Sequence, residues 1–233
     1  MKRHRNAQSK DSCINPERHT ASYGSPSPIL LIGGGGHALS LLEIMDPDDY
    51  PAGYSSPEPS GRMPLPWIGD DDTLRCKYPP GTARLVCAYV YGGRPDLSVR
   101  RKLIESFPGY SFPTVIASSA IVTPSSLVGE GTQIMHRCVI NRATIGNHCI
   151  VNTGAIVEHD CQTGDNVFIG PGAILGGEVS IGSDSFIGLG ATVRNGVKIC
   201  SGAVIGMGTD VMTDITKPGI YVGHGKRLIR LPV

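Results

Sequence analysis

Residues 145–182 read IGNHCIVNTGAIVEHDCQTGDNVFIGPGAILGGEVSIG, and an aliphatic side chain returns in this stretch at almost every sixth position. Counting in steps of six from Ile145 to Val211 gives twelve positions, of which only Thr163 is not aliphatic. A fixed short period is typical of a solenoid, in which similar coils stack on one another. The stretch therefore predicts a repetitive β-structure rather than a mixed globular domain.

The residues around each aliphatic position support this interpretation. Glycine often follows directly, at Gly146, Gly164, Gly170, Gly176, Gly182, Gly188 and Gly206. A small or β-branched residue often stands four places after the aliphatic one, as at Ala155, Ala173, Val179, Ala191, Val197 and Ala203. We expect the aliphatic side chains to point into a narrow prism with three hexads to a coil, and glycine to stand where a larger side chain would crowd the corner.

The same register continues upstream, with one interruption. Val122, Val128, Ile134 and Ile140 are spaced by six, but the next step, to Ile145, is only five residues. A missing residue must change how one coil meets the next. We therefore expect a local irregularity within residues 141–144.

The chain before residue 113 has a different pattern, in which apolar strands alternate with amphipathic segments. The predicted elements are a strand at 29–32, a glycine turn at 33–36, a helix at 38–45, a loop at 46–66, a strand at 83–90 and a helix at 96–107. The predicted parts of the chain are a flexible leader at 1–28, a βαβ domain at 29–113, the solenoid at 114–216 and a C-terminal tail at 217–233.

Composition excludes several classes of function. The formal net charge of +1 over 233 residues gives no general electrostatic reason to bind nucleic acid or an anionic membrane. The leader lacks the apolar run of a secretory signal, and the apolar stretch at 28–45 is too short to span a bilayer. Seven cysteines without a C-x-x-C pair favour a reducing cytoplasm over a disulfide framework.

His159 is the candidate general base. It stands two places after the inward Val157, at a corner that should face outward, between Glu158 and Asp160. An imidazole suits proton abstraction near neutral pH, and an adjacent carboxylate can fix its tautomer and raise its basicity. The alternative interpretation is a solvated corner residue.

The stretch quoted above, together with LLIGGGGHA at 30–38, resembles the bacterial sialic acid O-acetyltransferases and the bacillosamine-pathway UDP-amino-sugar N-acetyltransferases, which carry hexapeptide repeats. The resemblance covers residues 29–227. It implies a mixed fold, in which a small Rossmann-like βαβ domain that binds a nucleotide-sugar precedes a single-stranded left-handed parallel β-helix. It further implies a homotrimer with acetyl-CoA between neighbouring prisms, His159 as the base and Asp160 as the acid that polarises it.

The resemblance also implies roles for residues outside this pair. Those expected to hold the nucleotide-sugar are Gly35, Gly36 and His37. Those expected to contact acetyl-CoA are Gly177, Leu189 and Met207 along the channel, with Lys226 and Arg227 near the CoA phosphates. Backbone N–H groups at a helix start can receive a phosphate, and one beside the acetyl group could stabilise an oxyanion.

The sequence departs from the family pattern at three places. Phe168 stands where the family usually has a second histidine near acetyl-CoA, and Ser55 stands where an aspartate commonly follows the second strand. VGHGKR at 222–227 replaces the usual V-G-x-P-A-[KR], so Gly225 and its neighbours lack the proline that stiffens the tail.

Two other chemistries are disfavoured by spacing. Residues about eighteen apart should superpose on successive coils, whereas His136, His148 and His159 are twelve and eleven apart, so they form no obvious zinc trio. GGGGHA fits a loose dinucleotide fingerprint, but no acid follows at the end of the presumed second strand. The slot four places after an inward residue holds Cys138, Cys149 and Cys161, which we interpret as core fillers.

The expected function is that of a cytoplasmic acetyl-CoA-dependent acetyltransferase without a metal. Its acceptor would be an amino or hydroxyl group of a sugar, most simply a nucleotide-linked amino sugar for surface glycan synthesis. Three alternatives stay open: a sialic acid-type O-acetyltransferase, another acyl donor such as succinyl-CoA, and a hexapeptide-repeat scaffold without catalysis. Neither nucleic acid nor membrane insertion is expected.

Overall fold

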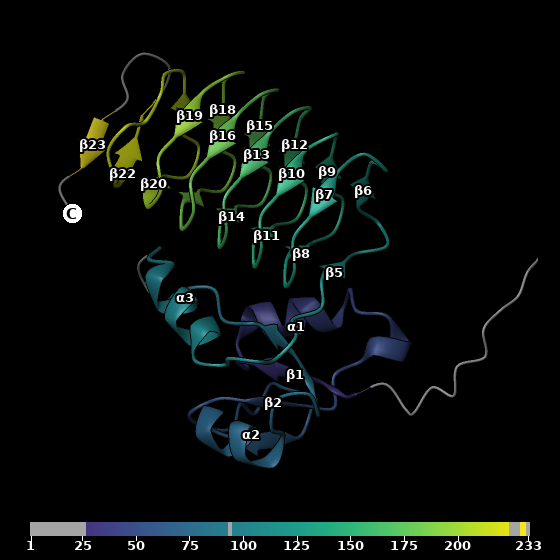
Figure 1. Cartoon of the computed structure of the whole chain (residues 1–233). Helices are drawn as coiled ribbons and strands as arrows, with labels where there is room; N and C mark the ends of the chain where they lie inside the picture. Colours follow the sequence, from purple (N-terminus) through teal and green to yellow (C-terminus); the bar gives the residue numbers. More distant parts are fainter. Residues whose placement is uncertain (1–26, 93–94, 224–228, 232–233) are drawn as a thin grey trace, which may run out of the picture.

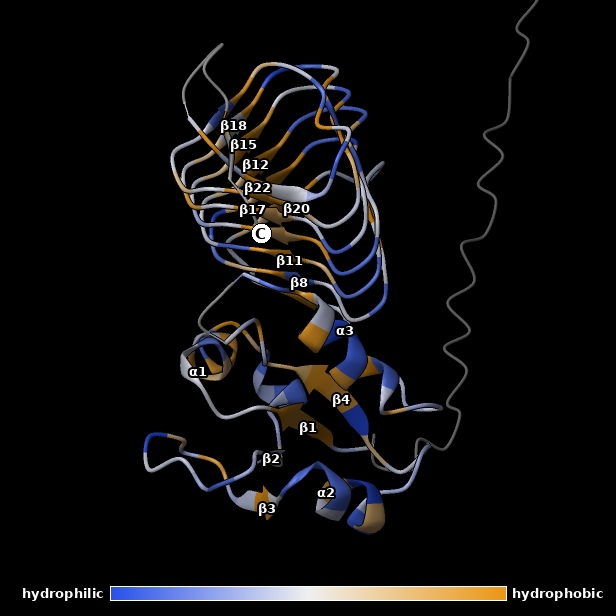
Figure 2. Ribbon diagram, turned by 90° about the vertical axis from the view of Figure 1, so that its left-hand side faces the viewer, coloured by the Kyte–Doolittle hydropathy of each residue, from blue (hydrophilic) through white to orange (hydrophobic). Residues whose placement is uncertain are grey.

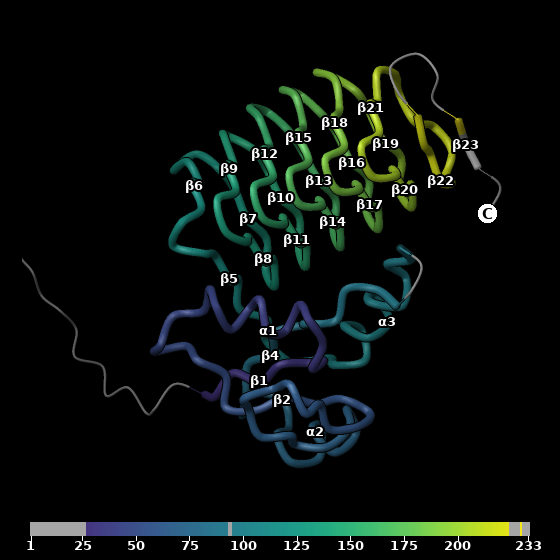
Figure 3. The backbone as a smooth tube through the Cα atoms, turned by 180° about the vertical axis from the view of Figure 1, so that it is seen from behind, coloured from purple at the N-terminus to yellow at the C-terminus, as the bar shows by residue number. Residues whose placement is uncertain are grey.

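The computed structural model describes residues 27–92, 95–223 and 229–231. A small parallel sheet with its helices forms the N-terminal part, and a β-solenoid of stacked coils forms the rest (Figure 1). The tube in Figure 3 shows the coils following one another from β6 at one end to β22 at the other. Most of the predicted leader lies outside the described residues.

The N-terminal sheet is parallel and has the strand order β3-β2-β1-β4. Its strands are β1 (Ile29–Ile32), β2 (Gly53–Ser55), β3 (Trp67–Gly69) and β4 (Arg84–Cys87). The helical segments are α1 (Gly36–Leu42), the 3-10 turn η1 (Pro47–Asp49), α2 (Asp71–Lys77) and α3 (Ser98–Glu105).

The strand predicted at 29–32 is present with the same bounds, as β1. The other predicted strand and the two predicted helices of this part are present with shorter or shifted bounds, as β4, α1 and α3. The loop predicted at 46–66 is wrong, because it contains η1 and β2. β2 has only three residues, and it exists because Leu30 to Ile32 of β1 pair with them. A strand of three residues is too short to show an alternation of apolar and polar side chains. It depends instead on pairing with a strand that is distant in the sequence.

The solenoid has three parallel sheets, which we name its first, second and third faces in the order the chain visits them. The first face contains β5 (Val115–Ile116), β8 (Gln133–Ile134), β11 (Ile150–Val151), β14 (Phe168–Ile169), β17 (Phe186–Ile187), β20 (Ala203–Ile205) and β22 (Gly219–Val222), with β23 (Ile229–Leu231) antiparallel at its end. The second contains β6 (Ile121–Val122), β9 (Val139–Ile140), β12 (Ile156–Val157), β15 (Ile174–Leu175), β18 (Thr192–Val193) and β21 (Asp210–Val211). The third contains β7 (Leu127–Val128), β10 (Thr144–Ile145), β13 (Gln162–Thr163), β16 (Ser180–Ile181) and β19 (Lys198–Ile199).

The predicted register and its interruption are both confirmed. Phe168 pairs with Phe186, eighteen residues further on, whereas Ile134 pairs with Val151, only seventeen further on. The shorter offset joins the coils on either side of the five-residue step. At most corners, the third residue after the inward-pointing one adopts a left-handed backbone. In the five-residue step, the left-handed residue is instead the second one after Ile140, which is Arg142 with φ 49°.

The aliphatic ladder forms the core of the solenoid. All twelve positions from Ile145 to Val211 are buried, including Thr163. The glycines after them are required by space: a Cβ on Gly146 would lie 2.3 Å from the carbonyl oxygen of Gly164, and one on Gly182 would lie 2.3 Å from the backbone nitrogen of Ser201. Figure 2 shows hydrophobic colours concentrated on the strands and hydrophilic ones on many connecting turns.

The three faces differ in what covers them. The first face packs against the N-terminal part, where Ile150, Phe168 and Phe186 form an apolar cluster with Leu97. The third face exposes polar side chains such as Gln162 and Lys198. The second face points away from the N-terminal part (Figure 1) and carries an aliphatic row at its first strands, listed from the start of the solenoid as Ile121, Val139, Ile156 and Ile174.

In the residues that the structure describes, no helix combines the length and the apolar character needed to cross a membrane.

Candidate active site

His159 lies at the corner that follows the second face, which we name the second corner. Its side chain is 48% exposed, and its Nδ1 lies 3.0 Å from Oδ2 of Asp160. Asp160 is the left-handed residue of this corner, with φ 60°. Aspartate tolerates that conformation better than most residues, so the corner turns while keeping the carboxylate beside the imidazole.

The electrostatics of the pair fix the imidazole tautomer. The pKa of Asp160 is lowered, first by its hydrogen bond with His159 and also by the charge of Arg142, whose Nη2 lies 3.3 Å from Oδ1. An ionised carboxylate can only accept, so Nδ1 of His159 carries the proton and donates it. The lone pair on Nε2 is then free to take a proton from a bound molecule.

Gly177 stands one coil beyond His159, directly against its ring. A Cβ built on Gly177 would lie 2.6 Å from both Nε2 and Cε1 of His159. The backbone of Gly177 is not left-handed, so the conformation of the turn does not require glycine there. Glycine is required because a side chain would overlap the imidazole of His159. The structure therefore brings together three of the residues predicted for the site: His159, Asp160 and Gly177.

A cleft of about 690 Å³ lies between the N-terminal sheet and the first face. The carboxyl ends of β1 and β4 form one side of it, which is where parallel sheets usually bind ligands. Its lining residues are Gly33, Gly34, Gly35, Gly36, His37, Ser40, Ser56, Pro57, Ala88, Tyr89, Val90, Tyr91, Asn152 and Phe168. The predicted nucleotide-sugar residues Gly35, Gly36 and His37 are thus all in this cleft, and none of its lining residues is His159 or Gly177.

His37 is held in the cleft by a buried amide. Its Nε2 lies 2.7 Å from Oε1 of Gln133, whose Nε2 donates to the carbonyl oxygen of Cys87 at 2.8 Å. Because the amide oxygen accepts, Nε2 of His37 carries the ring proton and Nδ1 is left as an acceptor. Burial lowers the pKa of His37, so the ring is neutral at pH 7 and suits a hydroxyl or amine donor better than a phosphate.

An aromatic cluster forms the wall of the cleft on the solenoid side. Phe168 stacks on Phe186 with ring centroids 4.6 Å apart, and Tyr91 meets both rings edge-on at 6.2 and 5.3 Å. The departure from the family pattern at Phe168 therefore falls on the cleft that holds His37. Tyr91 was missed from the sequence, although its place just after a predicted parallel strand was the available signal.

Ser55, the second departure, is hydrogen-bonded to a carboxylate. Its buried hydroxyl donates to Oδ1 of Asp71 at 2.7 Å, so a carboxylate from the start of α2 lies beside the end of β2. The sequence alone did not reveal this acid, because sixteen residues separate it from Ser55.

The predicted acetyl-CoA residues do not all lie together. Leu189 and Met207 stand one coil apart on the first corner, which follows the first face, and they are 44% and 78% exposed. Gly177 lies on the second corner, across the width of the second face. Lys226 and Arg227 lie outside the described residues, as does Gly225.

The cysteines predicted to fill the core do so. Cys138, Cys149 and Cys161 are buried within the aliphatic ladder, and burial raises the pKa of each thiol. They are therefore poor nucleophiles and poor metal ligands. Over residues 27–92, 95–223 and 229–231, no group of three or more His, Cys, Asp and Glu side chains could hold a metal ion.

Comparison with known proteins agrees with this architecture. Residues 160–195 match the family described as bacterial transferase hexapeptide (six repeats). The crystal structure of PerB from Caulobacter crescentus in complex with CoA and GDP-perosamine is 33% identical, with a TM-score of 0.78, over 88% of this chain and 97% of that one. The acetyltransferase domain of PglB from Neisseria gonorrhoeae FA1090 in complex with acetyl coenzyme A is 28% identical, with a TM-score of 0.79, over 88% of this chain and 99% of that one.

WeeI from Acinetobacter baumannii AYE shares the fold at 21% identity, with a TM-score of 0.71 over 88% of this chain and 99% of that one. The identity to PerB extends over nearly its whole length, through both the N-terminal sheet and the solenoid. The chain therefore belongs to the hexapeptide-repeat acyltransferases, in the group of the sialic acid O-acetyltransferases and the bacillosamine-pathway amino-sugar N-acetyltransferases, and it is an acyltransferase with a left-handed parallel β-helix.

Proposed function

We propose that the protein transfers the acetyl group of acetyl-CoA to an amino group of a nucleotide-linked sugar, with His159 as the general base. The observation that carries this proposal is the imidazole at the second corner, with its Nδ1 on an ionised Asp160 and its Nε2 against the side-chain-free Gly177. Relatives of the same architecture support the two substrates, since they were solved with CoA and GDP-perosamine or with acetyl coenzyme A.

In the proposed reaction, the acceptor nitrogen forms a bond to the thioester carbonyl carbon while Nε2 of His159 removes its proton. Asp160 stabilises the imidazolium that results, because its carboxylate accepts from Nδ1. The carbon–sulfur bond then breaks, and the proton on Nε2 passes to the departing CoA sulfur. Protons balance, and no metal or other cofactor is needed.

The acceptor would occupy the cleft, whose walls suit the parts of a nucleotide-sugar. Backbone N–H groups of Gly34, Gly35 and Gly36 can receive a diphosphate, whereas that of Gly33 already donates to the carbonyl oxygen of Ser55. The neutral His37 offers Nδ1 to a sugar hydroxyl or amine. Phe168 and Tyr91 present apolar ring surface on the solenoid side, against which a sugar ring can pack.

The active site is proposed to be shared between protomers of a homotrimer. Within one chain, the cleft opens beside the first face, where Leu189 and Met207 stand on the adjoining corner, whereas His159 lies on the second corner. The aliphatic row on the second face, with Ile121 61% and Ile174 42% exposed, supports self-association there. The proposal places the His159 of a neighbouring prism beside the first corner of this one, next to the cleft.

The first experiment is an acetyl-transfer assay. The protein is incubated with acetyl-CoA and UDP-, GDP- or dTDP-linked amino sugars, and release of free thiol is followed together with the mass of the product. Thiol release and an acetylated sugar with one acceptor support the proposal. Absence of transfer to every acceptor, with acetyl-CoA still bound, would contradict it and favour a non-catalytic scaffold.

Subunit complementation tests the shared site. His159→Ala and the cleft variant His37→Ala are each purified and are expected to have little activity. Randomly mixed trimers should regain roughly a quarter of the wild-type activity, because each mixed trimer contains an interface with both parts intact. If mixed trimers form but stay inactive, the base and the cleft belong to the same protomer, and the shared site is wrong.

A further inference from the structure

Arg100 of α3 is a buried guanidinium with only neutral hydrogen-bond partners. The residue is 1% exposed. Its Nε donates to the carbonyl oxygen of Tyr89 at 2.9 Å, and its Nη1 donates to the carbonyl oxygen of His148 at 2.5 Å and to Oδ1 of Asn166 at 2.6 Å. Nη2 is buried and has no hydrogen-bond partner. A buried cation normally requires an opposite charge, because removing it from water is costly.

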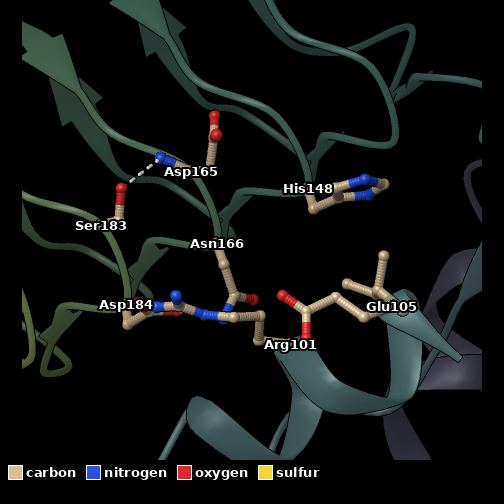
Figure 4. A pocket seen from close by; sticks show the side chains of 8 residues that line it. Arg101, Glu105, His148, Asp165, Asn166, Ser183 and Asp184 are labelled. Atoms are coloured by element: carbon tan, nitrogen blue, oxygen red, sulfur yellow. Dashed lines mark hydrogen bonds and ion pairs between the residues drawn. The ribbon is translucent and has the colours of Figure 1, made fainter.

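Asp184 is the carboxylate that this hydrogen-bond network reaches, and it is already paired with another arginine. Asp184 accepts from Nδ2 of Asn166 at 2.8 Å, and it also pairs with Arg101, whose Nε lies 2.8 Å from Oδ1. Figure 4 shows Arg101 reaching Asp184 from α3, with Asn166 beside them. Asp184 therefore pairs directly with Arg101, which is 47% exposed, and is linked to Arg100 only through the neutral amide of Asn166. A net positive charge is left at Arg100.

This charge lies behind the cleft. Tyr89, whose carbonyl oxygen Arg100 holds, lines the cleft and packs on the glycine turn, since a Cβ on Gly33 would lie 3.2 Å from the backbone nitrogen of Tyr89. The charge of Arg100 also adds to the effect of burial in lowering the pKa of His37. The described lining of the cleft includes no Lys, Arg, Asp or Glu. Among the described residues, Arg100 is therefore a positive charge that acts on a cleft residue from outside the lining.

We propose that Arg100 selects acceptors that carry a diphosphate, by placing an uncompensated positive charge behind the Tyr89 peptide and the glycine turn. The inference rests on the proposed function, since it assigns the anion to the nucleotide-linked acceptor. Arg100 acts through Tyr89 and through its field, so it is a positioning residue and does not touch the substrate. Charge in a poorly hydrated interior acts over several ångströms more strongly than it would in water.

The test compares each nucleoside diphosphate with its nucleoside. Dissociation constants for GDP and guanosine, and for UDP and uridine, are measured by calorimetry on the wild type and on Arg100→Gln, Arg100→Lys and Arg75→Gln. Arg75 is the matched control, because it also carries one positive charge but pairs directly with the exposed carboxylate of Asp72 in α2. Arg100→Gln should weaken diphosphate binding by about tenfold while the nucleoside changes by less than about twofold.

Arg100→Lys should keep most of the preference for diphosphate, and Arg75→Gln should keep all of it. If Arg100→Gln weakens diphosphate and nucleoside equally, with a lower melting temperature, Arg100 is only a structural tie and the inference is wrong. A wild type that binds neither diphosphate also overturns it. In that case acetyl transfer to an unphosphorylated amino sugar would show that the catalytic part of the proposed function stands independently.

Discussion

The second corner of the solenoid and the cleft beside the N-terminal sheet are constructed in opposite ways. At the corner, His159 meets its own sequence neighbour Asp160 and the residue one coil further on, Gly177. In the cleft, His37 depends on Gln133, ninety-six residues away. The corner follows from a local repeat, so substitutions there should act on chemistry with little effect on folding. The cleft follows from packing between distant segments, so substitutions there should affect binding and stability together.

The largest expected effect is that of His159→Ala. Loss of the proposed base should lower kcat by about a hundredfold or more, while the melting temperature stays close to that of the wild type because the side chain is half exposed. Steady-state kinetics and thermal unfolding check both statements. Gln162→Ala, an exposed change on the third face, is the control and should leave kcat unchanged. Near-normal turnover by folded His159→Ala protein would show that the base is another group.

Gly177→Ala tests the corner without removing any functional group. The new methyl would overlap the His159 ring, and the side chain rather than the backbone would have to move. We expect kcat to fall about tenfold, since small misplacements of a catalytic group are costly, with little change in stability. Kinetics and the imidazole NMR signals of His159 report the two effects. A full kcat with a displaced ring would mean that the placement of the imidazole over Gly177 is not needed for catalysis.

Phe168→Leu tests the cleft. The substitution shortens the aromatic wall and removes the stack on Phe186, so KM for the nucleotide-sugar should rise several-fold and the free energy of unfolding should fall by about 1 kcal/mol. KM for acetyl-CoA should change less than KM for the acceptor. Tyr91→Phe keeps a ring at the edge of the wall and serves as the comparison. Equal changes in both KM values would indicate a general distortion instead of an acceptor contact.

The smallest expected effect is a pH dependence of stability that originates in the cleft. The pKa of His37 is below its ordinary value of 6.5, mainly through burial, so the unfolded chain binds more protons than the folded one below that pH. The free energy of unfolding should therefore decrease as pH falls from 7 to 5. His148 contributes in the same direction, also mainly through burial.

Urea denaturation at pH 7 and pH 5 measures this loss. His37→Gln should reduce the loss relative to the wild type, because glutamine does not titrate, while His159→Gln at the exposed corner provides the comparison. An unchanged pH dependence in His37→Gln would show that His37 is not the group responsible.

Much of the solenoid followed from the sequence because each side chain in it is placed by its position in an eighteen-residue coil. The inward ladder, Thr163 within it, the irregularity after Ile140 and the outward corner of His159 were all predictable in this way. The N-terminal part was predictable where a strand was strongly apolar, as in β1 and β4, or where a helix was amphipathic, as in α1 and α3. β2 was missed because three residues are too few to show an alternating hydrophobic pattern, and because β2 pairs with β1, which is distant in the sequence.

The sequence by itself determined where the proposed base, His159, could stand, because a local period fixes which side chains face outward. Only the tertiary structure decided what surrounds it. Packing of the first face against the N-terminal sheet brought Phe168 and Tyr91 into one cleft, made His37 neutral and buried Arg100 without a carboxylate of its own. Burial and electrostatic environment depend on which distant segments meet, and no short-range pattern records that.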